Sequence, residues 1–155
     1  MSENTTTTHG LTSTEVKTLG EHAISAKSLA YCPYSNFRVG CALLCADGSY
    51  VLGANIENAS YPVTICAERT AFGKAVVEGK RESGGFRAVG VSTDISPPAS
   101  PCGMCRQFIR EFCDLKIPIF MWDSKGEYAV MTLEQLLPMS FGPDQLQKPD
   151  PNQGK

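Results

Sequence analysis

The sequence has no apolar run near the ~20 residues that a membrane-spanning helix needs. Its first nine residues are polar and rich in threonine, so the basic start and apolar stretch of a secretory signal are missing. No cluster of five or more Lys and Arg residues occurs, and the formal net charge is −2. We therefore expect a cytoplasmic protein without a membrane or nucleic-acid partner.

The cysteines do not suit a disulfide framework, because there are seven of them, an odd number. In a reducing compartment such thiols remain available for metal binding or for burial. Four of them show no ligand pattern and are expected to be structural: Cys32, Cys41, Cys45 and Cys113. The other three lie in two short motifs that point to chemistry.

The length of 155 residues suits a single domain. Residues 1–10 are expected to be disordered, residues 11–142 to form one catalytic domain, and residues 143–155 to form a flexible tail. Apolar periodicity and turn residues predict, in chain order, a helix, a hairpin, a helix, a strand, a helix, two strands and a helix. This order suggests an α/β fold with a mixed sheet of about five strands and helices on both faces.

The expected element boundaries follow from local signals. Thr12 and Glu15 form a possible capping box for the first helix, which we expect Pro33 to end. Asp47-Gly48 is a hairpin turn signal between two alternating strands. The expected strands are 37–44, 50–56, 87–93, 117–122 and 127–131, and the later helices are 65–79, one opening at Pro101, and 132–137.

A cysteine and a carboxylate stand close together in Cys66-Ala67-Glu68, and a Cys-x-x-Cys pair, Cys102 and Cys105, follows further along the chain. Catalytic zinc is held by three protein ligands, with a fourth position open to water and a base nearby that is not a ligand. Both motifs are expected at helix N-termini, where free N–H groups and the helix dipole favour thiolates. The sequence predicts a zinc site on these three cysteines, with Glu68 as the general acid and base.

Two arginines adjoin the predicted ligands. Arg69 is placed to hydrogen-bond the sulfurs and offset their negative charge, and Arg106 beside Cys105 is a second candidate. The alternative is that both arginines are surface residues and that Glu68 is an ordinary helix-start carboxylate. The sulfur-bonding role is favoured for Arg69 and less so for Arg106, and the position of Glu68 two residues from a ligand favours its acid and base role. A thiol redox motif would leave Cys66 without a role, and a structural zinc would require a fourth Cys or His at suitable spacing.

Five segments resemble the cytidine deaminase family, and the similarity runs from about residue 11 to residue 143: they are 31–40, 55–62, 66–71, 100–107 and 136–143. Cysteine rather than histidine at position 66 resembles the small, homotetrameric, three-cysteine branch. The resemblance implies a three-layer α/β/α fold and one Zn²⁺ per subunit. It also implies hydrolytic deamination of cytidine and deoxycytidine to uridine and deoxyuridine, a step of pyrimidine salvage.

The same resemblance implies substrate contacts. Phe37 would stack on the pyrimidine ring, while Asn55 and Glu57 would hold the ribose, chiefly at its 3′-hydroxyl. The backbone N–H of Ala67 would bind the ring carbonyl, and the carbonyl of Ser100 would accept a hydrogen bond from the leaving amine.

Three further residues are implied to complete the site of a neighbouring subunit: Ala59, Tyr61 and Phe141. Without the resemblance, the aromatic side chains of Phe37, Tyr61 and Phe141 would be assigned to ordinary core packing. Two rival functions remain open, a deaminase of another cytosine nucleoside and a polynucleotide cytosine editor.

Overall fold

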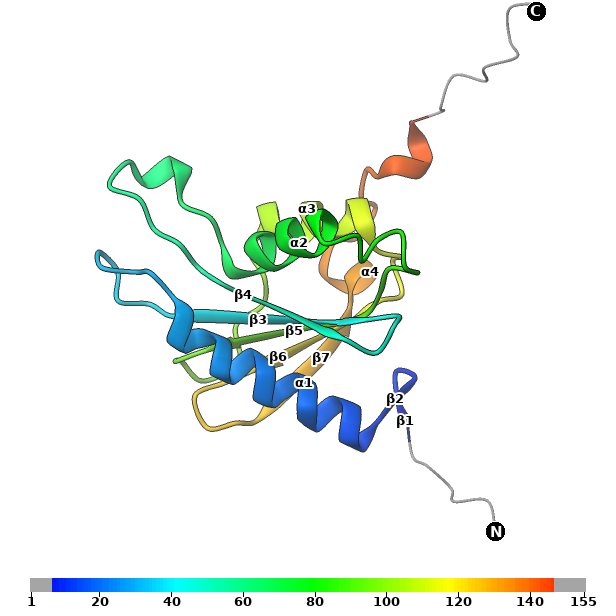
Figure 1. The fold of residues 1–155 in the computed structure, drawn as a ribbon, viewed down its shortest axis with the longest axis horizontal. Coiled ribbons are helices and arrows are strands. Elements are labelled where there is room, and N and C mark those ends of the chain that lie inside the picture. Colours follow the sequence, from blue (N-terminus) through cyan, green and yellow to red (C-terminus); the bar gives the residue numbers. More distant parts are fainter. Residues whose placement is uncertain (1–6, 147–155) are drawn as a thin grey trace, which may run out of the picture.

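A five-stranded sheet lies between two helical layers in the computed structural model, which describes residues 7–146 (Figure 1). The strand order is β4-β3-β5-β6-β7, where β5 and β6 are parallel and the other pairs are antiparallel. The strands are β3 (Val39–Cys45), β4 (Tyr50–Ala54), β5 (Phe86–Thr93), β6 (Pro118–Trp122) and β7 (Tyr128–Thr132). The predicted mixed sheet with helices on both faces is confirmed.

The helices divide between the two faces of the sheet. Figure 1 shows α1 (Ser13–Ala26) alone on one face, opposite α2 (Ala67–Val77), α3 (Gly103–Phe112) and α4 (Leu133–Leu136). Short 3₁₀ turns follow α1 at Lys27–Leu29 and precede α2 at Tyr61–Val63. None of the helices described is both long and apolar enough to cross a bilayer.

Each face of the sheet has its own apolar core. The core under α1 includes Leu19, Ala23, Leu44, Phe120 and Trp122. The core under α2, α3 and α4 is larger and includes Leu43, Phe72, Val89, Ile109 and Ile119, together with three of the cysteines expected to be structural: Cys41, Cys45 and Cys113. The fourth, Cys32, is half-buried. The metal site described below is built on the larger core.

The first helix begins where its capping box predicts and ends earlier than expected. The Glu15 N–H donates to Thr12 Oγ1 (3.1 Å), and the Thr12 N–H donates to the Glu15 carboxylate (2.9 Å). The helix ends at Ala26, well before Pro33, so the expected end is wrong. Near this end the hydroxyls of Ser25 and Ser28 donate to backbone carbonyls three residues back, a local bonding that competes with regular helix.

Both ends of the domain carry more structure than the sequence predicts. Strand β1 (Thr7–Thr8) pairs with β2 (Leu11–Thr12) through a tight turn, so the disorder expected for residues 7–10 is wrong. The carbonyl of Gly10 in that turn accepts a hydrogen bond from Arg87 on β5 (3.3 Å). A 3₁₀ turn, η3 (Pro143–Gln145), occupies the start of the expected flexible tail. The rest of both predicted segments, 1–6 and 147–155, lies outside the described residues.

Helix α2 lies very close to β4, because Gly53 has no side chain at the point of contact. A Cβ at Gly53 would come within 2.5 Å of the Ala67 carbonyl oxygen and the Ala71 nitrogen. Both atoms belong to backbone, which cannot move aside as the end of a flexible side chain can. The contact therefore sets the height of the first turn of α2, and of the cysteine before it, above the sheet.

We expect Gly53→Ala to displace the start of α2, because overpacking of this kind costs roughly 1–3 kcal/mol. Its melting temperature and its zinc content should both fall. The matched control is Gly73→Ala in the same helix, where a Cβ meets nothing within 4 Å and the change should be neutral or stabilising. Full stability and full zinc in Gly53→Ala would show that this contact does not position the site.

Candidate metal centre and active site

Three thiols at the N-terminal ends of α2 and α3 converge, and Figure 1 shows these two helices on the same face of the sheet. Cys66 is the N-cap of α2, Cys102 is the N-cap of α3, and Cys105 lies in the first turn of α3. The three sulfur atoms all lie within 4.8 Å of one another, and the Cys66 and Cys102 sulfurs are 4.0 Å apart. The sequence prediction that these three cysteines come together is confirmed.

The geometry of this cluster fits a tetrahedral zinc ion. Two sulfurs that each lie about 2.3 Å from a tetrahedral zinc are separated by about 3.8 Å, close to the observed distance. Within residues 7–146 no fourth Cys, His, Asp or Glu joins the group. A structural zinc with four protein ligands is therefore not supported. Three soft ligands with one position left open match a catalytic site.

The electrostatic surroundings favour a thiolate at Cys66. A hydrogen bond from the Cys105 thiol and the nearby Arg69 guanidinium lower the pKa of Cys66 to about 5. The Arg69 Nη2 atom lies 3.5 Å from the Cys66 sulfur and also donates to the Thr64 carbonyl (3.3 Å). Arg69 thus lies where the sequence predicts, beside the ligand sulfurs. Since the thiolate is the form that binds metal, the site is prepared for a cation.

Arg106 hydrogen-bonds oxygen atoms rather than the sulfurs for which its place beside Cys105 makes it a candidate. Its guanidinium donates to the carbonyls of Pro101 (2.7 Å) and Leu136 (2.6 Å) and to the Ser100 hydroxyl (2.6 Å). All three bonds end on oxygen. Arg106 therefore ties the loop that precedes Cys102 to the end of α4, and it supports the sulfurs only through that loop.

Glu68 is almost fully buried, with 4% of its surface exposed, and lies in the wall of the cavity that also contains Cys66 and Cys102. Burial raises the pKa of the Glu68 carboxyl, because the charged form loses its hydration. A raised pKa makes the carboxylate a better proton acceptor, which suits a group that both takes and returns a proton. The position fits a proton shuttle better than a helix-start carboxylate, which needs no burial.

The cavity beside the three thiols has a volume of about 590 Å³, within the range of small-molecule sites. Five residues that the resemblance implies as substrate or neighbour contacts line it: Phe37, Asn55, Glu57, Tyr61 and Ser100. Sequence reasoning missed several other lining residues: Tyr34, Ser35, Val39, Thr64, Val91, Thr93 and Ala99. The alternation of β5 offered a signal for Val91 and Thr93, which share a face with the core residue Val89.

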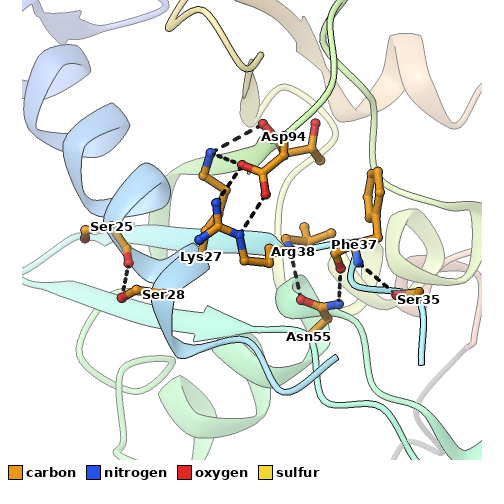
Figure 2. A network of polar contacts seen from close by, with 10 residues as sticks. Ser25, Lys27, Ser28, Ser35, Phe37, Arg38, Asn55 and Asp94 are labelled. Carbon is orange, nitrogen blue, oxygen red and sulfur yellow. Dashed lines mark hydrogen bonds and ion pairs between the residues drawn. The ribbon is translucent and has the colours of Figure 1, made fainter. Parts of the chain in front are cut away.

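Asn55 and Glu57 both have partners within the chain. The Asn55 side chain accepts from the Val39 N–H (2.9 Å) and donates to the Phe37 carbonyl (2.8 Å), as Figure 2 shows. The Glu57 carboxylate accepts from the Ser35 hydroxyl (2.5 Å) and backbone N–H. These bonds fix the segment that carries the Phe37 ring. Each side chain keeps spare hydrogen-bonding capacity, since an amide offers two N–H groups and a carboxylate about four lone pairs.

A salt-bridge network lies on the other side of the same segment. In Figure 2, Lys27 and Arg38 converge on Asp94, with distances of 2.8 Å from Lys27 Nζ and 2.8 Å from Arg38 Nε. Asp94 directly follows β5, and Arg38 directly precedes β3. The network joins the start of the loop that leads to Ser100 to the segment that carries Phe37.

Comparisons with known proteins agree with this geometry. The family model for the cytidine and deoxycytidylate deaminase zinc-binding region matches residues 13–121, a range that contains all three cysteines and Glu68. A cytidine deaminase of Sporosarcina psychrophila is 46% identical over 132 residues, covering 85% of this chain and 95% of that protein. The chain belongs to the cytidine deaminase family.

Further relatives support the family assignment. A cytidine deaminase of Halalkalibacterium halodurans is 46% identical over 121 residues, covering 78% of this chain and 89% of that protein. The crystal structure of cytidine deaminase from Burkholderia pseudomallei matches with a TM-score of 0.75 at 38% identity, covering 81% of this chain and 98% of that one. The predicted cytidine-deaminase-like fold is confirmed, and the zinc-binding region of the family agrees with one zinc ion on the cysteine trio.

Three of the residues that the cytidine deaminase resemblance implies as contacts, Ala67, Ala59 and Phe141, lie outside the cavity lining. Ala67 is fully buried in the first turn of α2 and does not line the cavity. Ala59 and Phe141 do not line it either, and Ala59 is exposed. Exposed fractions of 68% for Tyr61 and 59% for Phe141 show that core packing is wrong for both aromatic side chains.

Proposed function

We propose that this cytidine deaminase family member hydrolyses cytidine and deoxycytidine to uridine and deoxyuridine, with release of ammonia, as a step of pyrimidine salvage. The observation that carries the proposal is the burial of Glu68 in a cavity wall that also contains two of the three clustered thiols. Cys66, Cys102 and Cys105 would hold one zinc ion per subunit. A free carboxyl group with raised pKa beside an open metal position is the arrangement that hydrolytic deamination requires.

The protein's own residues then have defined tasks. When bound, zinc supplies a Lewis acid that makes a water molecule acidic enough to be deprotonated near neutral pH. Glu68 would take one proton of that water and pass it to N3 of the ring while the water oxygen forms a bond to C4. It would then take the second proton from the new C4 hydroxyl and pass it to the amino group, so that the C4–N bond breaks, ammonia leaves and the C4 carbonyl remains. Arg69 offsets part of the negative charge of the three sulfurs.

Substrate contacts would orient C4 toward this centre. Phe37 stacks on the pyrimidine ring, and the remaining hydrogen-bonding capacity of Asn55 and Glu57 holds the sugar. The presence of all three in the lining of one cavity supports these roles. The Ser100 carbonyl accepts from the leaving amine, and the Ala67 N–H binds the ring carbonyl. That N–H is in the first turn of α2, where backbone donors have no partner within the helix.

The active form is proposed to be a homo-oligomer, a tetramer, in which Ala59, Tyr61 and Phe141 contact the substrate of a neighbouring subunit. The exposure of both aromatic side chains supports an interface role, because it leaves them accessible to a neighbouring subunit. We also propose a cytoplasmic location. All seven cysteines are free thiols, as a reducing compartment requires.

A comparison of substrates separates this proposal from its rivals. Values of kcat/KM should be high for cytidine and deoxycytidine and lower for free cytosine, which lacks the sugar contacts that orient C4. A cytosine-containing oligonucleotide should react hardly at all. It has no free 3′-hydroxyl at an internal position, Glu57 would repel its phosphate, and the net charge of −2 offers no attraction to a strand.

Two results of the same assay would contradict the proposal. An oligonucleotide that matches cytidine would make the chain a polynucleotide editor. A sugar-modified cytosine nucleoside that reacts much faster than both natural nucleosides would assign the rival nucleoside function.

A further inference from the structure

Arg110, in the last turn of α3, is a buried arginine whose partners all come from one distant segment, residues 140–144. Only 7% of the residue is exposed. Its Nε donates to the Ser140 hydroxyl (3.2 Å), and its Nη2 forms an ion pair with the Asp144 carboxylate. The guanidinium also lies against Gly142, where any Cβ would overlap it. The planar Arg110 guanidinium thus occupies the space beside Gly142 that the side chain of any other residue would take.

Phe141 lies in the middle of this segment, and its backbone is held from both sides. Gln107, one turn before Arg110 on the same face of α3, donates from Nε2 to the Phe141 carbonyl (2.9 Å). The Gln145 side chain accepts from the Gly142 N–H. The backbone of an exposed residue is therefore fixed by several side chains, although the Phe141 ring itself is 59% exposed and lines no part of its own subunit's cavity.

Burial of a guanidinium is costly unless its donors find acceptors. The acceptors of Arg110 are available only when residues 140–144 dock on α3, so docking of the segment and burial of the arginine depend on each other. Lysine cannot replace it, because a single ammonium group lacks the planar fork that reaches Ser140 and Asp144 while lying flat on Gly142. The side chain therefore couples α3, which carries two of the thiols, to the position of Phe141.

We propose that Arg110 is a positioning residue that fixes the segment 140–144, so that Phe141 is presented to the substrate cavity of a neighbouring copy of the chain. The proposal rests on the proposed oligomeric deaminase, in which Phe141 completes a neighbour's site. It identifies the side chain that holds the Phe141 segment in place. It also explains why a buried arginine binds a segment whose aromatic residue is exposed.

The first test is the kinetics of Arg110→Lys, with Asp144→Asn as a second variant whose surface position makes misfolding no concern. KM for cytidine should rise by at least about tenfold in Arg110→Lys, because a slightly misplaced contact weakens substrate orientation. Zinc per chain should not change, since the cysteine centre is at the other end of α3. The matched control is Arg81→Lys, an arginine with 60% side-chain exposure whose ion pair is with the adjacent Glu82.

The second test uses mixed oligomers, because a purely structural defect stays with its own subunit. Arg110→Lys is assembled with an excess of Glu68→Gln copies, which are inactive but carry an intact Phe141 segment. The Arg110→Lys sites should then recover KM toward the wild-type value, and Phe141→Ala assembled in the same way should recover too. Recovery in both mixtures supports the proposal.

Two outcomes overturn it. Recovery with Phe141→Ala but not with Arg110→Lys would mean that Arg110 serves only the folding of its own subunit. If KM recovered in neither mixture while the wild-type protein was active, no copy would contribute Phe141 to the site of another. A wild type that releases no ammonia from cytidine would instead contradict the proposed function itself, so the two failures are distinguishable.

Discussion

Replacement of Glu68 by glutamine is expected to lower kcat for cytidine by ~10² to 10⁴, the usual contribution of a positioned acid and base. Glutamine keeps the shape of the buried side chain but can neither take a proton from water nor pass one to the ring. The zinc content should stay at the wild-type level, because the carboxylate is not one of the clustered ligands. Metal analysis of the same protein separates a loss of proton transfer from a loss of the centre.

The matched control for this change is Glu78→Gln. Glu78 is exposed at the other end of the same helix, α2, and lies outside the cavity. It should keep wild-type turnover. A Glu68→Gln protein with near-normal turnover would contradict the proposed role and leave Glu68 as a carboxylate that merely favours the helix N-terminus.

Cys102→Ala is expected to abolish both zinc binding and activity. The two remaining sulfurs cannot hold the ion against competing ligands in solution, since a catalytic zinc site needs three protein ligands. Cys102 is exposed, so its truncation opens no void in the core and the fold should persist. Metal content by mass spectrometry and thermal denaturation of the same sample test both expectations.

The control here is Cys32→Ala. Cys32 is half-buried and belongs to neither the thiol cluster nor the cavity lining, so zinc and turnover should remain. If Cys102→Ala kept a full zinc content, the metal would have to bind elsewhere. If it lost zinc but kept its turnover, the metal would have no part in the reaction.

Local signals in the sequence account for the parts of the fold that were predicted correctly. The capping box of Thr12 and Glu15 acts within four residues, and the Asp47-Gly48 turn joins two strands whose alternation is visible in the sequence. The cluster of Cys66, Cys102 and Cys105 was also predictable. Cys-x-x-Cys on one helix turn brings two sulfurs together, and Cys66-Ala67-Glu68 matches the ligand-x-Glu motif of zinc deaminases.

Long-range contacts were beyond the same reasoning. Arg106 beside Cys105 was considered for the sulfurs, but its acceptors are oxygens of residues brought to it by the loop before α3 and by α4. Arg110 gave no signal at all, because its partners lie about thirty positions away and only the docked segment creates its site.

Pattern analysis also could not predict which aromatic side chains are exposed. Periodicity identifies apolar side chains that need cover, but it does not say whether the cover is the same chain or another copy. Tyr61 and Phe141 would be assigned to the core on that basis, and only their exposure in the folded chain excludes it. Their proposed contact with a neighbour came from the family resemblance and stays a prediction.

The most direct test of a zinc-dependent cytidine deaminase measures bound zinc and cytidine-dependent ammonia release on the same preparation, through graded removal of the metal with a chelator and its return. We predict that activity rises in proportion to bound zinc up to one ion per chain, vanishes when zinc is removed and recovers when zinc is added back. A metal-free protein that keeps full activity, or a fully zinc-loaded protein that releases no ammonia from cytidine, would contradict the account.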